Sequence, residues 1–176
     1  MATTKVLSEL ALRKRVTQER LREVLNYDPE TGVFTWRVPR QGTGGVGSVA
    51  GRVNPGNGYI DICIDYRRYL GHRLAWLYMT GEWPTNDVDH KDRIRTNNAW
   101  SNLRAATRAQ NLANAGKRRG SKTPYKGIQK AGKSGWQALI TVRGVRRCLG
   151  TYRTPEQAAE AYKAASIKFN GEFAPT

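Results

Sequence analysis

The apolar residues of this 176-residue chain come in short segments separated by glycines and polar turns. The longest uninterrupted apolar run, Leu74 to Met79, has six residues, whereas a membrane-spanning helix needs roughly 20. Short segments build short strands and helices. The pattern therefore predicts an α+β protein of two small domains, without membrane association.

Residues 17–81 alternate between helical and strand-like periodicity. The expected elements are a helix over 17–26, a strand within 32–38, two strands over 59–64 and 67–70, and a helix over 72–80. Thr17 is the expected N-cap of the first helix, and Gly81 ends the second. The glycine-rich stretch 42–51 lacks the Gly-Lys-Ser/Thr ending of a phosphate-binding P-loop, so we interpret it as a flexible loop.

Positive charge is concentrated toward the C-terminus. Residues 1–111 carry 17 Lys and Arg against 11 Asp and Glu, a net charge of +6, whereas residues 112–176 carry 13 against 3, a net charge of +10. This density favours a polyanionic partner, because each Lys or Arg on a phosphate releases condensed counterions. A membrane surface is the less favoured partner, because the sequence contains no basic amphipathic helix with a bulky apolar face.

The N-terminal segment and the two cysteines show no targeting, redox or zinc-binding motif. The N-terminal residues have no apolar core before a small-residue cleavage site, which predicts a cytoplasmic protein of a bacterial or phage-infected cell. Cys63 and Cys148 lie far apart and form no CxxC pair, so neither a structural zinc site nor a disulfide framework is expected.

The segment 87–114 carries a pattern suited to phosphodiester hydrolysis. It reads as strand, loop, strand and a short helix capped by Thr107. Hydrolysis needs a base near neutral pH, for which His90 is suited, and a cation to neutralise the charge that develops on the phosphate. Asp89 and the amide oxygen of Asn111 are hard ligands, which favour Mg²⁺ or a similar ion such as Mn²⁺ over zinc.

This segment resembles the HNH (ββα-metal) endonucleases of the phage and homing type, in the variant that has Asn for the last His. The matching residues are VDHKD at 88–92, NN at 97–98, NLR at 102–104 and QN at 110–111. The resemblance implies that His90 is the general base, that Asp89 and Asn111 bind the metal, and that Asn102 acts as a catalytic residue or as a brace of the loop. The arginines near this site that could hold phosphates are Arg93, Arg95 and Arg104.

Two points in this segment stay open at the level of sequence. Consecutive residues of a regular strand point to opposite faces, so the strand must end or bulge at Asp89 and His90 for both to serve one phosphate. The segment around His72, HRLAW, is similar to one found in phage-type members of the family, which extends the resemblance back to about residue 20. We prefer a structural or loop-bracing His72 over a catalytic one.

Beyond a basic linker at 116–124, the residues predict three short strands and one helix. The strands are expected within 125–130, 136–142 and 146–152, and the helix over 155–169. Its buried stripe is expected to contain Ala158, Ala161, Tyr162, Ala165 and Phe169.

Residues 125–174 resemble the APETALA-two (ethylene-response-factor) DNA-binding domain. The matching residues are YKGI at 125–128, GWQALI at 135–140, LGTY at 149–152 and TPEQAAEAY at 154–162. The resemblance implies a sheet that lies in the major groove of duplex DNA with the helix on its other face. The side chains expected toward DNA are Lys126, Gln129, Lys130, Lys133, Gln137, Leu139, Thr141, Arg143 and Arg146. Trp136 is expected in the core rather than as a stacking platform.

Together these features predict a metal-dependent DNA endonuclease. Its expected organisation is an N-terminal extension over 1–16, a nuclease domain over 17–115 with its core at about 71–115, the linker, and the DNA-binding domain over 125–174. A non-catalytic, sequence-specific DNA-binding regulator is the alternative, and an RNA-directed role is disfavoured by the lack of an aromatic RNP-like strand. The single set of catalytic candidates slightly favours a monomer. The sequence does not reveal the DNA target or whether one or both strands are cut.

Overall fold

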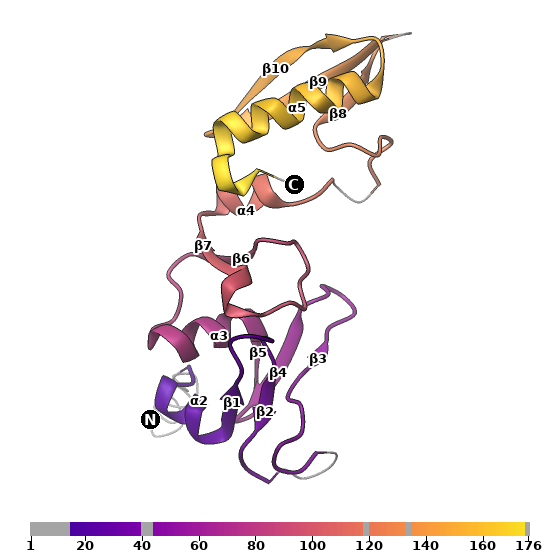
Figure 1. The fold of residues 1–176 in the computed structure, drawn as a ribbon. Helices are drawn as coiled ribbons and strands as arrows, with labels where there is room; N and C mark the ends of the chain where they lie inside the picture. The colour runs from indigo at the N-terminus through magenta and orange to yellow at the C-terminus, as the bar shows by residue number, and fades with distance from the viewer. Residues whose placement is uncertain (1–14, 40–43, 118–119, 133–134, 175–176) are drawn as a thin grey trace, which may run out of the picture. The chain divides into compact units, whose positions relative to one another are not determined.

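The structure is a computed structural model that describes residues 15–39, 44–117, 120–132 and 135–174 (Figure 1). It has α+β character and divides into two compact units, one formed by residues 1–85 and 95–103 and the other by residues 86–94 and 104–176. The extension expected over 1–16 lies mostly outside the described residues. The domain boundary expected at 116–124 stays a prediction, and each unit is described here separately.

The first unit contains short strands and two helices. In chain order these are α2 (Gln18–Val24), β1 (Leu25–Tyr27), β2 (Phe34–Trp36), β3 (Arg52–Val53), β4 (Ile60–Ile64), β5 (Arg67–Leu70), α3 (Gly71–Thr80) and the 3-10 turn η1 (Trp100–Asn102). β1 pairs with β2, and β3, β4 and β5 form an antiparallel sheet in that order. The strands and helices expected between residues 17 and 80 are thus present.

The first helix is shorter than its sequence pattern predicts. α2 ends at Val24, and Leu25–Tyr27 pairs with Phe34–Trp36 as a strand. The tertiary reason is burial, because Leu25 and Tyr27 alternate inward and contribute to the core with Phe34. The rings of Tyr27 and Phe34 lie 4.7 Å apart. Thr17 caps the helix as expected, since its side chain accepts a hydrogen bond from the Arg20 N–H.

The tight turn expected at Asp65 and Tyr66 is present between β4 and β5. Both residues have positive φ angles, +47° and +63°, as a two-residue hairpin turn of type I′ requires. Behind this hairpin, Ile62 and Ile64 are buried together with Leu74 and Leu77 of α3. The sheet and helix therefore share one apolar core.

The second unit begins with a strand pair and a short helix. β6 (Asp87–His90) pairs with β7 (Leu103–Ala106), and α4 (Arg108–Asn114) follows directly. Thr107 caps α4 through a capping box, in which its side chain accepts from the Gln110 N–H and the Gln110 side chain accepts from the Thr107 N–H. The predicted order of strand, loop, strand and helix is confirmed.

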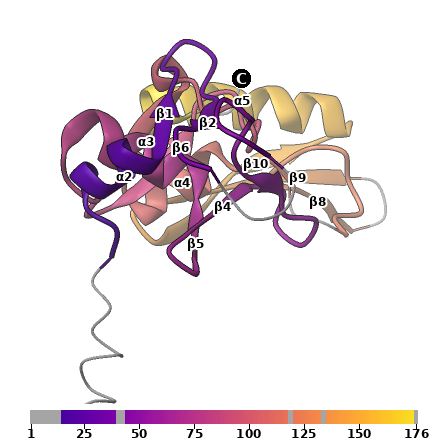
Figure 2. The same ribbon diagram turned by 90° about the horizontal axis from the view of Figure 1, so that it is seen from below.

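A three-stranded antiparallel sheet and a long helix complete this unit. The elements are β8 (Ile128–Ala131), β9 (Gly135–Val142), β10 (Val145–Tyr152), α5 (Pro155–Asn170) and the 3-10 turn η2 (Gly171–Phe173). β9 is the central strand, and α5 lies along one face of the sheet (Figures 1 and 2). The buried core between sheet and helix consists of Ile128, Ala138, Ile140, Ala158 and Tyr162. Trp136 packs against this core, as expected.

One glycine of this module is required by packing. Gly127 has a φ of +72°, and a Cβ atom there would collide with the ring of Tyr162. A larger residue would therefore require the Tyr162 ring or the Leu139 carbonyl to shift, in a backbone conformation that other residues rarely adopt.

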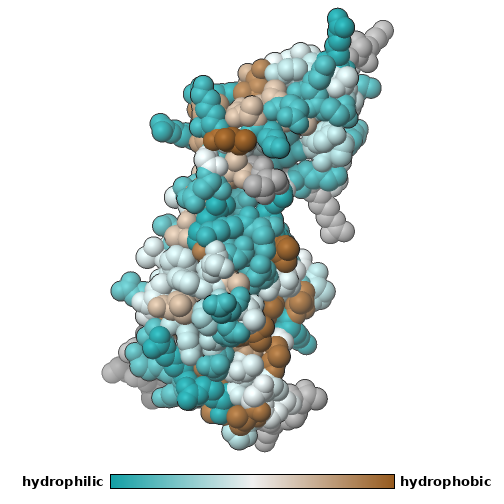
Figure 3. Space-filling view, viewed as in Figure 1, coloured by the Kyte–Doolittle hydropathy of each residue, from teal (hydrophilic) through white to brown (hydrophobic). Residues whose placement is uncertain are grey.

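The predicted helix stripe is confirmed in part. Ala158 and Tyr162 are buried, Ala165 packs against the core, and Ala161 is half-buried. Phe169 has 41% of its surface exposed, whereas Ser166, outside the predicted stripe, is fully buried. The visible surface of the module around α5 is largely hydrophilic (Figure 3). Among the described residues, none of the helices combines the length and apolarity that crossing a membrane requires.

Candidate active site

The strand that carries Asp89 and His90 ends at His90. The next residues turn sharply, since the Arg93 N–H donates to the His90 carbonyl at 3.0 Å and Arg93 has a φ of +65°. The expectation that β structure must end at this dipeptide is confirmed. Asp89 and His90 are both buried, with 5% and 4% of their surface exposed. Two polar residues are thus enclosed at the end of one strand.

The carboxylate of Asp89 is held from two sides. Arg104, on the neighbouring strand β7, donates from Nε at 2.9 Å and approaches with Nη2 at 2.8 Å, both toward Oδ2. From α4, the Asn114 amide nitrogen lies 3.0 Å from each carboxylate oxygen. These contacts compensate the cost of burying a charge.

Arg104 is itself fixed by the C-terminal turn η2. Its guanidinium carbon lies 3.8 Å from the centre of the Phe173 ring, and Nη1 donates to the Glu172 carbonyl at 2.6 Å. Only 11% of its side chain is exposed. Arg104 was expected to flank the site and hold phosphate, but the structure places its guanidinium between Asp89 and Phe173.

Asn114 is the residue of this site that the sequence pattern did not identify. Its amide nitrogen also donates to the His90 carbonyl at 2.8 Å, and it is 97% buried. The signal was present in the helical spacing, because Asn114 lies three residues after Asn111 and so faces the same side of α4.

The second candidate ligand, Asn111, also contacts β6. Its amide nitrogen donates to Asp87 Oδ2 at 2.9 Å. Among the described residues its amide oxygen receives no hydrogen bond, so that atom is available to an ion or water. The described residues contain no cluster of three or more His, Cys, Asp or Glu side chains placed to hold a metal, so a cation here would rely on amide oxygens and water beside Asp89.

Three further candidates belong to the first unit. The amide of Asn102 donates to the Asn97 carbonyl at 2.8 Å, a contact that braces the loop before β7. Arg95 lies with its guanidinium 5.0 Å from the centre of the Tyr59 ring and donates to the Asn57 carbonyl. His72 is buried, and its ring centre lies 4.9 Å from that of Tyr59.

The sheet of the second unit presents a connected polar network on the face opposite α5. Arg146 donates to Gln129, Gln129 donates to Gln137, and Gln137 contacts the Cys148 sulfur, at 3.1, 3.0 and 3.1 Å. Thr141, paired with Arg146 in the register, is also exposed on this face. Arg143 lies exposed in the turn between β9 and β10.

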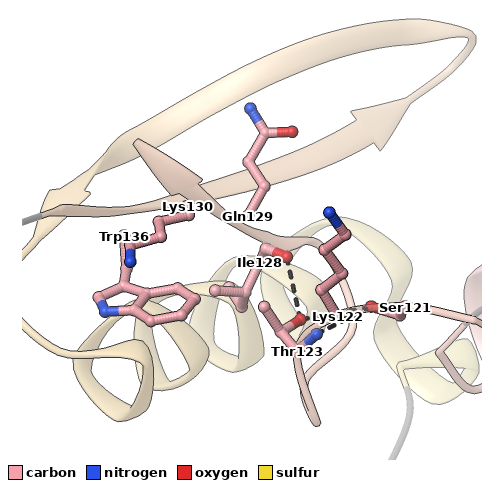
Figure 4. A pocket seen from close by; sticks show the side chains of 7 residues that line it. All are labelled: Ser121, Lys122, Thr123, Ile128, Gln129, Lys130 and Trp136. Atoms are coloured by element: carbon pink, nitrogen blue, oxygen red, sulfur yellow. Dashed lines mark hydrogen bonds between the residues drawn. The ribbon is translucent and has the colours of Figure 1, made fainter. Parts of the chain in front are cut away.

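Two lysines that were expected on this face lie elsewhere. Lys130 pairs with Trp136, and paired residues share a face, so Lys130 is on the helix side of the sheet. There it lines a hollow of about 500 Å³ with Lys122, Thr123 and Trp136 (Figure 4).

Lys126 points to the C-terminal end of α4. Its ammonium donates to the carbonyls of Leu112, Ala113 and Ala115 at 2.9, 2.5 and 2.6 Å. Burial, with a smaller contribution from the charge of Arg93, lowers the pKa of Lys126 to about 8. Lys133 lies outside the described residues.

The strands β6 and β7 and most of α4 fall within a segment that matches a known protein family. Residues 69–113 match the family of HNH endonucleases, and this segment includes Asp89, His90, Asn102 and Asn111. The match covers 45 of the 176 residues of the chain.

Two individual proteins are similar to this chain. It is 33% identical over 105 residues to a protein of Acanthamoeba polyphaga mimivirus named uncharacterized HNH endonuclease L560, and the match covers 58% of this chain and 54% of that protein. The chain thus spans about half the length of that relative. A solved structure of the HNH homing endonuclease I-HmuI, described as showing DNA binding and cleavage, matches with 19% identity and a TM-score of 0.40 over 78% of this chain and 76% of that one.

Proposed function

We propose that this chain is a metal-dependent DNA endonuclease that hydrolyses phosphodiester bonds. The observation that carries the proposal is the placement of Asp89 and His90 at the end of β6, beside a helix that bears Asn111, within the segment that matches HNH endonucleases. A surface Asp-His pair would need no burial and no supporting contacts. Here both residues are at least 95% buried, and the carboxylate is fixed by two neighbours.

His90 is the proposed general base. It accepts a proton from the attacking water, and the resulting hydroxide forms a bond to phosphorus while the bond from phosphorus to the leaving 3′ oxygen breaks. β6 ends at His90, and the chain turns there through the bond that the Arg93 N–H donates to the His90 carbonyl. Asn102 would act on the same loop as a brace rather than by touching the reacting atoms, a role that its bond to the Asn97 carbonyl supports.

The donor set fits a hard divalent cation such as Mg²⁺ or Mn²⁺. Asp89 would supply a carboxylate oxygen and Asn111 its amide oxygen, and both ligands belong to the same unit. Within the part of the chain that the structure describes, Oδ1 of Asp89 accepts a hydrogen bond from Asn114 alone, which leaves that oxygen a remaining acceptor position. When bound, such an ion would neutralise the charge that develops on the phosphate and on the leaving oxygen.

The basic C-terminal module would position duplex DNA. Arg143, Arg146 and the polar network on the exposed face of β8, β9 and β10 present donors to a phosphate backbone and to base edges. Gln129 and Gln137 carry the amide groups suited to reading bases. Lys130 and Lys126 are not part of this proposed surface, because their side chains lie away from the exposed face.

The test is cleavage of a supercoiled plasmid with Mg²⁺ or Mn²⁺. We expect His90→Ala to lower the rate by at least roughly 100-fold, the contribution of a general base, and chelation by EDTA to abolish cleavage. The chain has just two histidines, so a folded His72→Gln is the matched control and should retain activity. Undiminished cleavage by His90→Ala would contradict the assignment. DNA binding without cleavage under any of these conditions would favour a non-catalytic regulator.

A further inference from the structure

We infer that Asn114 is a positioning residue, which fixes Asp89 and the end of β6 so that Asp89 and His90 can serve one phosphate. The inference deepens the proposed nuclease function and rests on it. It assigns a role to an asparagine outside the Asp-His and Asn-Asn positions on which the family resemblance depends.

The contacts of Asn114 converge on the Asp-His dipeptide. Its amide nitrogen is 3.0 Å from both oxygens of Asp89 and 2.8 Å from the carbonyl oxygen of His90. One buried amide thus joins the side chain of the first residue to the main chain of the second. An amide that binds the carboxylate of Asp89 and the main chain of His90 fixes that carboxylate relative to the end of β6.

The register between α4 and β6 explains why an asparagine stands at this position. Asp87 and Asp89 lie two residues apart on a strand, so their side chains share one face. Asn111 and Asn114 lie three residues apart on a helix, so they also share one face. The structure pairs them in order, Asn111 with Asp87 and Asn114 with Asp89. Each amide therefore holds one carboxylate, and the helix cannot shift along the strand without breaking both contacts.

The chemistry of the amide suits a group that supports a metal ligand. Arg104 already supplies a full positive charge to Asp89, and a second cation there would weaken the attraction of the carboxylate for a metal ion. The neutral Asn114 amide orients the carboxylate without adding charge. Groups that orient a metal ligand in this way typically change metal affinity or activity by roughly 10–100-fold when they are removed.

The experiment combines Mn²⁺ binding with DNA cleavage by the whole 176-residue chain. Asn114→Ala removes the amide, and Asn114→Leu removes it while keeping the same number and branching of side-chain heavy atoms and raising helix propensity. The matched control is Asn54→Ala, because the Asn54 amide also donates to a carboxylate, Asp61 at 2.8 Å, in the first unit. Mn²⁺ affinity is measured by calorimetric titration, cleavage by single-turnover kinetics, and folding by circular dichroism during heating.

We expect both Asn114 variants to bind Mn²⁺ and to cleave DNA roughly 10–100-fold more weakly than the wild type, with Asn54→Ala unchanged in both. In the background of Asp89→Asn, adding Asn114→Ala should reduce cleavage by less than about threefold, since residues that act as a unit are not additive.

Three outcomes overturn the inference. If the folded Asn114 variants keep wild-type Mn²⁺ affinity and cleavage, the inference about Asn114 fails while the proposed nuclease function stands. If both variants lose Mn²⁺ binding and cleavage only because they unfold, Asn114 has a structural role and the inference fails as well. A wild-type protein that neither binds Mn²⁺ at millimolar concentration nor cleaves DNA overturns the proposed function and this inference with it.

Discussion

The two parts of the second unit use their polar side chains in opposite ways. In β6, β7 and α4, the residues Asp89, His90 and Asn114 are almost completely buried and are held by defined partners. On the sheet of β8 to β10, Gln129 and Arg146 lie exposed and contact each other at the surface. A site for chemistry requires fixed geometry, whereas a surface for binding must be accessible to a large partner.

The largest expected effect comes from the buried ion pair between Arg104 and Asp89. Arg104→Met leaves the carboxylate buried without its positive partner, so the free energy of unfolding should fall by about 3–5 kcal/mol. Urea denaturation followed by circular dichroism measures this change.

A second ion pair to β6, made by Arg108 of α4 with Asp87, provides the control. Arg108 lies 3.4 Å from Asp87, but 78% of its side chain is exposed. Arg108→Met should therefore cost less than about 1 kcal/mol. If Arg104→Met and Arg108→Met lowered the free energy of unfolding equally, burial would not explain the contribution of the ion pair with Asp89.

An intermediate effect is expected on the exposed sheet face. Arg146→Ala should weaken binding to duplex DNA about equally for all sequences and reduce the slope of log affinity against log salt by about one, because one phosphate contact is lost. Lys130→Ala should leave the slope nearly unchanged, since Lys130 lies on the helix side. Fluorescence anisotropy over a range of salt concentrations measures both, and the reverse result would assign the DNA surface to the other face.

The smallest expected effect concerns the pH dependence of stability at Lys126. The ordinary pKa of 10.5 falls to about 8 in the folded protein, mainly through burial. Between these two values the unfolded chain binds more protons than the folded chain, so the stability of the wild type should rise with pH across this window. In Lys126→Met this rise should be smaller. Thermal unfolding from pH 7.5 to 10.5 tests the difference, and identical pH profiles would exclude the contribution.

Much of the fold follows from local patterns in the sequence. Strand alternation placed Ala138 and Ile140 of β9 toward the helix, and both are buried. The order of elements around Asp89 and His90, with Thr107 as a cap, is also confirmed. These features are local, because periodicity and capping depend on residues within a few positions of each other.

Other features depended on contacts between distant segments. The burial of Phe173 against Arg104, 69 residues earlier in the chain, left no pattern in the sequence. Lys126 and Lys130 look like any basic residues in a basic module, and only the strand register and the α4 carbonyls place them away from the exposed face. The roles of individual site residues therefore stay predictions for the experiments above.

The sequence by itself determined the chemical types at the candidate site, a base at His90 with hard oxygen ligands at Asp89 and Asn111, because those properties belong to the side chains. Only the tertiary structure decided which groups hold them. Asn114 became part of the site because α4 packs against β6 in one register, and Arg104 faces Asp89 because β7 pairs with β6. Such pairings arise from the burial of whole segments, a property that no short stretch of sequence contains.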